Sequence, residues 1–468
     1  MSRLLLQALY LVAAVLFIVG MKQLSSPRGA RRGNWISAVG MVIALLTTVI
    51  NLVLLHKFTA AGAVLAVIGV IIGGVVGTVG ARRVRMTAMP QMVALFNGVG
   101  GGAAALVAVY ELTYILGRHP SAAESFPSVF SIVIGGVSFA GSMVAFAKLQ
   151  ELMTGTPITY PGQQVVNGLI AAAILGFAFA LIVIANVPLA FVSLLVLALV
   201  LGVAFVLPIG GADMPVVISL LNAFTGLAVA ASGFILDNFA LIVAGTLVGA
   251  SGTLLTLLMS QAMGRSIANV LFAAVGTPVA GPAGAAGSEG KSVRAGQADD
   301  IGTMLAYSRR VIIVPGYGLA VAQAQHVVRE LADLLEKKGV TVDYAIHPVA
   351  GRMPGHMNVL LAEANVPYEQ LKEMDAINDE FKSTDVVLVV GANDVVNPAA
   401  RNSPGSPIYG MPILNVDDAH NIVFLKRSMR PGFAGIDNEL YLDPKTGMLF
   451  GDAKQAVEKV LQELKKAA

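Results

Sequence analysis

The 468-residue chain has no cysteine, one tryptophan and few charged residues, which make up 13% of the sequence. The absence of cysteine excludes disulfides, thiol catalysis and thiolate metal sites, and no other metal site is predicted. A water-soluble chain carries roughly 25% charged residues, whereas this chain is 56% hydrophobic. The composition therefore excludes an ordinary water-soluble enzyme and indicates that much of the chain lies in lipid.

Charge is divided unequally along the chain. Residues 1–275 hold 12 Lys and Arg and 5 Asp and Glu, whereas residues 276–468 hold 19 and 23. The basic excess lies between apolar segments, so no continuous basic face could bind nucleic acid. We predict a transmembrane domain at residues 1–265 and a Pro-, Gly-, Ala- and Ser-rich linker at residues 266–302. A water-soluble domain is predicted at residues 303–468.

Nine apolar stretches in the first domain approach the ~20 residues that a helix needs to cross a bilayer. They are residues 4–20, 35–55, 59–80, 88–116, 127–147, 165–186, 188–207, 215–236 and 239–262. The separation at Asn186–Pro188 is the weakest, so eight or ten spans remain alternatives. The first stretch lacks a clean cleavage site and is expected to be a retained helix. The prediction is a multi-pass α-helical domain in a lipid bilayer.

Short loops predict the orientation of the spans, because cytoplasmic loops carry an excess of Lys and Arg. Nine basic residues follow odd-numbered spans, and three lie on the other face. The nine are Lys22, Arg28, Arg31, Arg32, Arg82, Arg83, Arg85, Lys148 and Arg265, and the three are Arg3, Lys57 and Arg118. With nine spans, the N-terminus is expected outside and the C-terminal domain in the cytoplasm.

Few polar groups lie in or beside the predicted spans. Asp213 precedes Pro215, where a carboxylate can either cap a helix or take part in proton transfer or gating. Asn97 and Asn222 lie inside spans four and eight, where an amide either joins helices or holds water. Glycines at four-residue spacing, which favour close helix packing, form three sets. These sets are Gly69, Gly73 and Gly77; Gly98 and Gly102; and Gly245 and Gly249.

Strand and helix patterns alternate in the C-terminal domain. Apolar runs predict strands at residues 310–314, 340–346, 386–390, 413–416 and 422–425, and helical periodicity predicts helices at residues 319–338 and 453–466. This alternation is typical of an α/β doubly wound parallel sheet of the Rossmann type. The long loops at residues 349–358 and 391–402 would follow strands, where open sheets bind ligands.

A glycine turn and a cationic cluster indicate a dinucleotide site. Gly316-Tyr317-Gly318 follows the first strand, as in a dinucleotide fingerprint, although Val321 replaces the third glycine, so a plain tight turn is an alternative. The second strand ends at Ile346-His347-Pro348 without an acid that could bind a ribose 2′-hydroxyl. The cluster Lys426-Arg427-Ser428-Met429-Arg430 suits a 2′-phosphate, with a solvated loop as the alternative. The residues therefore favour NADP(H) over NAD(H).

Five longer motifs resemble a known family. They are Val314–Gln325, His347–Glu363, Gly391–Asp394, Lys426–Ser428 and Pro208–Pro215. Over essentially its whole length the chain resembles the β subunit of bacterial proton-translocating NAD(P) transhydrogenases. The resemblance implies an inner-membrane enzyme that transfers hydride from NADH to NADP⁺ while protons enter the cytoplasm. A partner α subunit would bind NAD(H), and two αβ units would form a dimer.

The resemblance also implies the residues that contact NADP(H). They are Tyr317, Val349, Ala350, Gly351, Arg352, Met353, Pro354, Gly391, Ala392, Asn393, Asp394, Val395, Gly410, Met411, Lys426, Arg427, Ser428, Met429, Arg430, Pro431, Gly432, Phe433, Asp452 and Ala453. It further implies that Asp394 couples NADP(H) binding to proton transfer, and that Asp213 and Asn222 act in proton conduction.

Two positions depart from the family pattern. Asn97 stands where some members have a proton-relay histidine, which is then expected on the partner's helices, and Phe433 stands where many have tyrosine. No residue resembles a covalent catalyst, which fits a direct hydride transfer. The alternative function is a transporter or channel gated by an NADP(H)-sensing domain.

Overall fold

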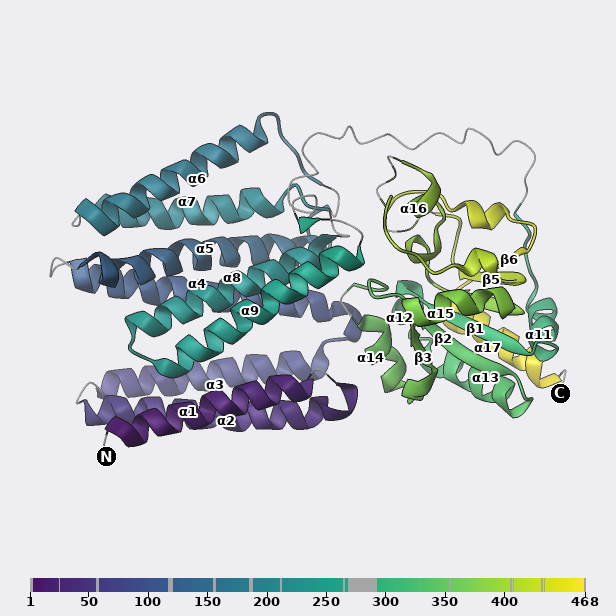
Figure 1. The fold of residues 1–468 in the computed structure, drawn as a ribbon, viewed down its shortest axis with the longest axis horizontal. Helices are drawn as coiled ribbons and strands as arrows, with labels where there is room; N and C mark the ends of the chain where they lie inside the picture. The colour runs from purple at the N-terminus through teal and green to yellow at the C-terminus, as the bar shows by residue number, and fades with distance from the viewer. Residues whose placement is uncertain are drawn as a thin grey trace. The chain divides into compact units, whose positions relative to one another are not determined.

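The computed structural model describes residues 3–24, 26–55, 59–116, 121–154, 157–184, 188–210, 213–263, 266–267, 293–352, 355–404, 406, 408–430, 432 and 434–466. The chain divides into two compact units. Met1–Gly210 and Val216–Thr256 form the helical unit, and Gly211–Pro215 and Leu257–Ala468 form the sheet unit (Figure 1).

The described part of the helical unit contains nine long helices, one at each predicted apolar stretch (Figure 1). They are α1 (Arg3–Leu24), α2 (Pro27–Leu54), α3 (Ala60–Arg83), α4 (Met89–Leu116), α5 (Ala122–Leu149), α6 (Gln163–Phe179, continued by a π-helical turn at Ala180–Ile184), α7 (Pro188–Val206), α8 (Met214–Ile235) and α9 (Phe239–Ala262). Eight are long and apolar enough to cross a membrane, and the Ala190–Val206 helix is shorter. These helices fit a membrane protein and confirm the predicted fold class for this half.

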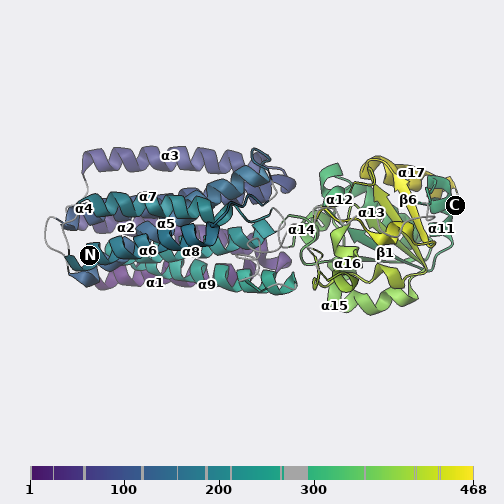
Figure 2. The same cartoon turned by 90° about the horizontal axis from the view of Figure 1, so that it is seen from above.

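Glycine packing joins two pairs of these helices. A Cβ atom on Gly98 of α4 would lie 2.4 Å from Met143 Cε of α5, and one on Gly245 of α9 would lie 2.4 Å from the Ala230 nitrogen of α8. Close approach therefore requires glycine at Gly245, which faces backbone, whereas Gly98 faces the flexible end of a methionine side chain. The glycines of α3 differ, since Gly69, Gly73 and Gly77 meet no described atom within 4 Å. No described residue of α3 is buried, and Figure 2 shows α3 along one margin of the helical unit.

A buried lysine closes the C-terminal end of α7. Lys148, in the last turn of α5, is only 3% exposed. Its Nζ donates to the carbonyl oxygens of Leu207 at 2.5 Å, Ile209 at 2.8 Å and Val206 at 3.5 Å. These carbonyls end α7 and begin its connection to α8, where a cation compensates the negative helix end. The expectation that Lys148 is a loop residue was therefore wrong, because its charge is held inside the helical unit.

The sheet unit has six parallel strands in the order β3-β2-β1-β4-β5-β6. The strands are β1 (Arg310–Pro315), β2 (Thr341–Ile346), β3 (Leu371–Glu373), β4 (Val386–Val390), β5 (Asn421–Lys426) and β6 (Thr446–Phe450). The helices are α11 (Ala298–Ala306), α12 (Tyr317–Ala322), α13 (Gln325–Lys337), α14 (His356–Glu363), α15 (Met374–Ile377), α16 (Ala399–Asn402) and α17 (Ala453–Lys466). This strand order is that of a doubly wound dinucleotide-binding sheet, so the second half of the fold prediction is also confirmed.

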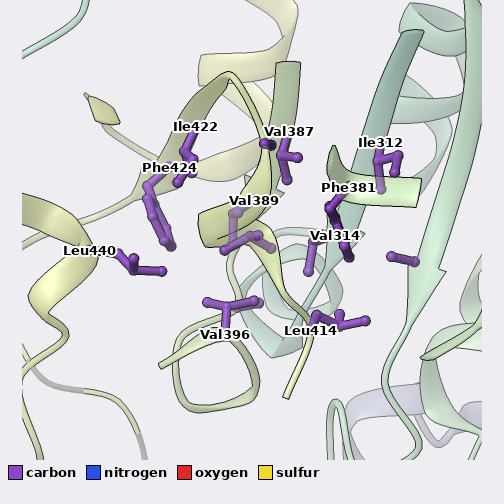
Figure 3. Close-up of a cluster of buried hydrophobic side chains, with 14 of the residues drawn as sticks. Ile312, Val314, Phe381, Val387, Val389, Val396, Leu414, Ile422, Phe424 and Leu440 are labelled. Atoms are coloured by element: carbon purple, nitrogen blue, oxygen red, sulfur yellow. The ribbon is translucent and has the colours of Figure 1, made fainter. Parts of the chain in front are cut away.

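The hydrophobic core lies on the sheet because β1, β4 and β5 are buried along nearly their whole length. Alternate residues of these strands, such as Val314, Val389 and Phe424, pack with Phe381 and Leu414 from the connections (Figure 3). α13 and α17 also pack against the sheet, and α11 packs on α17. Burial of both faces explains why these strands are continuous apolar runs in the sequence.

Local structure differs from the prediction at three places. The predicted helix 319–338 is two helices, because Gln323 adopts a left-handed φ of 48° between α12 and α13. Residues 413–416 form no strand, since Asn378 donates to the Ile413 carbonyl and accepts from the Asn415 N–H, each at 3.1 Å. Leu414 and Val416 are nevertheless buried in the core, and Ile413 is buried in a small neighbouring cluster. β3 and β6 were not predicted, because β3 is short and polar and β6 contains a glycine.

Charged groups fasten the edge of the sheet where the strands begin. Arg310 Nη2 lies 2.9 Å from Asp343 Oδ2 and also pairs with Glu380. Asp385 accepts from the backbone N–H groups of Arg309 at 2.7 Å and Arg310 at 3.1 Å. The strand-start edge thus carries ion pairs and backbone anchors.

The described end of the predicted linker contacts β6. The Gly296 N–H donates to the Met448 carbonyl, and the Met448 N–H donates to the Arg294 carbonyl, each at 2.8 Å. α11 then begins at Ala298. Residues 268–292 of the predicted linker (266–302) lie outside the described residues.

Candidate functional site

The predicted ligand segments gather at one edge of the sheet. Four of these segments follow strands: those that begin at Gly316, Val349, Gly391 and Asp452 follow β1, β2, β4 and β6. The fifth begins at Lys426, the last residue of β5. All strands are parallel, so their carboxyl ends share this edge. The chain reverses direction of winding between the neighbouring strands β1 and β4, and open sheets bind ligands in the crevice at such a switch point. We call these segments the carboxyl edge.

The glycine turn packs directly against the segment that follows β4. The N–H groups of Gly316 and Gly318 donate to the carbonyls of Val390 and Gly391, each at 2.9 Å. A Cβ atom would lie 2.4 Å from the Ala392 backbone if added to Gly316, and 2.7 Å from the Gly391 Cα if added to Gly318. Gly391 itself has a φ of +69°. The two glycines are therefore explained first by contact between the β1 and β4 loops.

The third position of the fingerprint does not take part in that contact. Val321 lies in the six-residue helix α12 and is 41% exposed. A side chain there is accommodated at the surface, so the missing third glycine leaves the turn intact. At Gly316 and Gly318, by contrast, any Cβ atom would clash with the backbone of Gly391 or Ala392.

The loop after β2 is organised around two buried histidines. His347 Nε2 donates to the Pro412 carbonyl at 2.8 Å, and its Nδ1 accepts from the Val349 N–H at 3.2 Å. Burial lowers the pKa of His347 to about 4, although the bond to Pro412 opposes the shift. His356 Nδ1 accepts from the Arg352 N–H at 3.1 Å. Burial and the nearby Arg352 charge lower the pKa of His356. Both rings are thus held neutral, as acceptors of loop backbone N–H groups.

Arg352 and Tyr317 connect this loop with the glycine turn. The Arg352 guanidinium carbon lies 4.5 Å from the centroid of the Tyr317 ring, and the same ring contacts His356 edge-on at 6.4 Å between centroids. Gly351 has a φ of +99° and packs on the His356 ring. A cation stacked on an aromatic face at this edge is suited to an anionic ligand.

A small apolar cluster fixes the Gly410–Met411 segment beside the β2 loop. Met411 is buried with Ala400, and Val349 packs against them. Gly410 has a φ of +83°, and its N–H donates to the Ala400 carbonyl at 2.9 Å. Ala350 is also buried. The predicted segments 349–352 and 410–411 therefore lie together.

The segments after β4 and β5 are joined by a hydrogen-bonded network. Lys426 Nζ donates to the Arg430 carbonyl at 2.8 Å and to the Tyr441 hydroxyl at 2.9 Å. The Tyr441 hydroxyl donates to Asn393 Oδ1, and Asn393 Nδ2 donates to Asp394 Oδ1 at 3.0 Å. Burial lowers the pKa of Lys426, while the Asp394 charge opposes this shift. Burial raises the pKa of Tyr441.

The remaining predicted contacts are more exposed or serve the backbone. Arg427 pairs with Asp452 at 3.1 Å, and Asp452 Oδ1 accepts from the Lys454 N–H at the start of α17. Ser428 Oγ accepts from the Arg430 N–H at 3.4 Å, and Met429 is 41% exposed. Ala392, Val395 and Ala453 are buried packing residues. Predicted contacts Met353, Pro354, Pro431 and Phe433 lie outside the described residues.

The described residues fit an anionic, phosphorylated nucleotide. Lys426 uses two of its three N–H donors within the described part of the chain. The Arg427 side chain is 62% exposed, and its Nη2 pairs with Asp452. His356 is fully buried, and its Nε2 has no hydrogen-bond partner among the described residues. Tyr441 and His356 were missed as site residues. His356 lies within a quoted motif, whereas no sequence pattern marks Tyr441.

Polar residues in the helical unit form a separate cluster around Asn97. Asn97 Nδ2 donates to Ser142 Oγ at 2.9 Å and to Ser138 Oγ at 3.3 Å. Ser138 Oγ donates to the Leu221 carbonyl at 2.8 Å and lies 2.6 Å from Thr225 Oγ1. This connects α4 and α5 with α8, next to Asn222, which is half-buried on α8. Asp213 directly precedes α8.

These features define a membrane protein with a doubly wound, dinucleotide-binding type of domain. A family model described as "NAD(P) transhydrogenase beta subunit" matches residues 6–463. Two sequences from Rhodospirillum rubrum, both named "NAD(P) transhydrogenase subunit beta", are 48% identical over 472 residues and cover 99% of this chain and 100% of their own length. The chain belongs to the NAD(P) transhydrogenase beta subunit family.

Family membership confirms the resemblance stated from the motifs. The chain is a subunit of the proton-translocating NAD(P) transhydrogenase and hence a component of an enzyme, not the alternative gated channel. Family membership also implies that the enzyme uses NAD(P)(H) and that this chain has a partner α subunit.

Proposed function

We propose that the sheet unit binds NADP(H) at its carboxyl edge and that the partner α subunit binds NAD(H). NADH on the α subunit then gives a hydride to NADP⁺ on this chain, and the transfer is coupled to proton movement into the cytoplasm. The predicted contact residues, from Gly316 to Ala453, constitute the binding site in this proposal.

The Lys426 ammonium is the observation that carries the preference for NADP(H). Arg430 and Tyr441 hold it in place, and its third N–H has no partner among the described residues and is proposed to bind the ligand. Arg427 adds a second cation beside it. In many dinucleotide sites an acid at the end of the second strand binds the ribose 2′-hydroxyl. Here β2 ends at Ile346, and His347 follows it, so this position has no carboxylate. Two cations next to each other after β5, with no carboxylate at the end of β2, favour a 2′-phosphate over a free 2′-hydroxyl.

The residues of the site act by positioning, because hydride transfer between nicotinamides needs juxtaposition and exclusion of water. NADP(H), when bound, supplies the nicotinamide that accepts or gives the hydride. Tyr317 and Arg352 would orient the ligand at the glycine turn, and Lys426 and Arg427 would bind its 2′-phosphate. The buried neutral histidines His347 and His356 hold the β2 loop in place.

The proton pathway is proposed to involve Asp213, Asn222 and Asn97, with Asp394 linking proton transfer to NADP(H) binding. Asn97 Oδ1 is buried without a hydrogen-bond partner among the described residues, which suits a proton path completed by a residue of the α subunit. A proton that crosses about 100 mV releases about 2.3 kcal/mol. That energy would bias the carboxyl edge between nucleotide-exchanging and reactive states.

The proposed location is the bacterial inner membrane, with the N-terminus outside and the sheet unit in the cytoplasm. The excess of basic residues on one face of the predicted spans supports this orientation. A dimer of αβ units in the bilayer is proposed from the family resemblance alone.

Calorimetry on the detergent-solubilised full chain tests the nucleotide assignment. We expect NADPH to bind at least about tenfold more tightly than NADH, which corresponds to about 1.4 kcal/mol. Equal affinities would refute the assignment. Lys426→Gln should remove most of the difference while NADH affinity stays the same.

Vesicles that contain the chain and its α subunit test the coupling. NADH-dependent reduction of NADP⁺ should proceed with a change in internal pH reported by a dye. Ion flux without redox turnover would instead support a gated channel, and neither would indicate an assembly subunit.

A further inference from the structure

Tyr441 lies between the Lys426 cation and the neighbouring residues Asn393 and Asp394. Its hydroxyl accepts from Lys426 Nζ at 2.9 Å and donates to Asn393 Oδ1. Asn393 Nδ2 then donates to Asp394 Oδ1 at 3.0 Å. Each residue in this series donates a hydrogen bond to the next one. The bonds therefore run in one direction, from the Lys426 ammonium to the Asp394 carboxylate.

The surroundings of Tyr441 fix this geometry. The residue is 4% exposed, and its ring contacts the Phe424 ring edge-on, with 5.0 Å between centroids and 88° between planes. Lys426 Nζ also lies 4.6 Å from the centroid of the Tyr441 ring. Asn438 Nδ2 donates to Asn393 Oδ1 at 3.3 Å, which sets the orientation of that amide. A packed ring therefore presents its hydroxyl to both neighbours at once.

A second connection reaches Asp394 from the same loop. Asp394 Oδ2 accepts from the Ala434 N–H at 2.9 Å. A Cβ atom on Gly432 would lie 2.5 Å from Asp394 Oδ1 and 2.3 Å from Asn393 Nδ2. The loop that begins at Lys426 is thus connected to the Asp394 carboxylate twice. Its first residue is connected through Tyr441 and Asn393, and Ala434 is hydrogen-bonded to it directly.

We propose that Tyr441 is a positioning residue that connects the Lys426 cation to the Asp394 carboxylate, so that binding of a 2′-phosphate at Lys426 is transmitted to Asp394 through Asn393. The inference rests on the proposed function, in which Lys426 binds NADP(H) and Asp394 couples it to proton transfer. It adds a residue outside the predicted contacts and assigns it both cofactor selectivity and communication. Hydrogen-bonded networks of this kind are coupled units whose members are not energetically independent.

The Tyr441→Phe variant removes the hydroxyl and keeps the ring that packs on Phe424. Tyr344→Phe is the matched control, because Tyr344 is fully buried in β2 of the same unit and its hydroxyl has no partner among the described residues. Calorimetry with NADPH and NADH on the full chain gives the readout. We expect Tyr441→Phe to weaken NADPH binding about tenfold, the usual effect of losing a hydrogen bond to a charged group. NADH binding and the Tyr344→Phe control should stay within about twofold of wild type.

A double-mutant cycle separates communication from simple loss of structure. Asp394→Asn and Tyr441→Phe are measured singly and together by NADPH affinity. If Tyr441 acts through Asp394, the double variant should bind no more weakly than the weaker single variant. Strictly multiplicative losses would overturn the inference, as would a Tyr441→Phe variant that weakens both nucleotides equally.

The result also distinguishes this inference from the proposed function. Wild-type protein that prefers NADPH, together with an unaffected Tyr441→Phe variant, refutes the role of Tyr441 alone. Wild-type protein without any preference refutes the nucleotide assignment itself.

Discussion

Lys148 offers the sharpest test of how the helical unit is held together. Lys148→Met keeps the length of the side chain and removes its charge and donors. Two short bonds, to the Leu207 and Ile209 carbonyls, are lost outright. Each hydrogen bond to a charged group contributes roughly 1.5–3 kcal/mol.

The fate of the carbonyls sets the size of the effect. After the substitution, Val206 keeps the Ile209 N–H at 3.2 Å, and Leu207 keeps the Ile158 N–H at 3.1 Å. The Ile209 carbonyl has no other partner among the described contacts. With one orphaned acceptor and two lost charged bonds, we expect the free energy of unfolding to fall by about 3–5 kcal/mol. This corresponds to a Tm lowered by about 10 °C for a unit of this size.

Thermal unfolding in detergent micelles provides the measurement. Lys148→Arg retains the cation and should recover at least about half of the lost stability. Arg82→Met is the matched control, because Arg82 is exposed in the last turn of α3. The reasoning fails if Lys148→Met melts within about 2 °C of this control, a difference of less than about 1 kcal/mol.

Three further predictions concern the sheet unit and the coupling. Gly318→Ala should destabilise the sheet unit by about 1–3 kcal/mol and abolish NADPH binding, because the added Cβ atom would overlap Gly391. The control is Gly447→Ala, whose Cβ atom would meet nothing within 4 Å; its NADPH affinity in calorimetry should be unchanged. His347 binds a proton more weakly when folded than when unfolded, so the free energy of unfolding should fall as the pH falls from about 6.5 to about 4, by about 2 kcal/mol between about pH 7 and about pH 4.5. Denaturant titration should show this slope in wild type and not in His347→Gln, and an equal slope in both would contradict the assignment. Asp213→Asn should reduce proton-coupled formation of NADPH in vesicles at least about tenfold, and unchanged coupling with unchanged NADPH affinity would remove Asp213 from the pathway.

The sequence predicts the helices and the central strands well, because lipid and a sheet buried on both faces each require unbroken apolar runs. It does not predict the break at Gln323, since a left-handed glutamine leaves no glycine signal. It also misassigns the run that contains Leu414, because the side chain of Asn378 replaces the backbone partners that a strand would have. An apolar run reports burial and leaves the hydrogen-bond partner undetermined.

The candidate site divides in the same way. The Gly316 turn and the Lys426 cluster are visible because glycine and clustered cations are locally unusual. Tyr441 lies 48 residues from Asn393 in the sequence. Its ring packs on Phe424 of β5, which pairs with β4, the strand that precedes Asn393. A contact between segments so far apart follows from topology, which the composition of neither segment reveals.

The ion pairs around Arg310 and the ligand loops occupy opposite rims of one parallel sheet, since one rim collects strand starts and the other strand ends. Random mutagenesis of this unit should therefore yield two separable kinds of defective variant. Changes at the first rim should reduce heat tolerance and spare ligand selectivity, and changes at the second should do the reverse. Evolution could alter what this unit recognises while leaving the scaffold that supports it untouched.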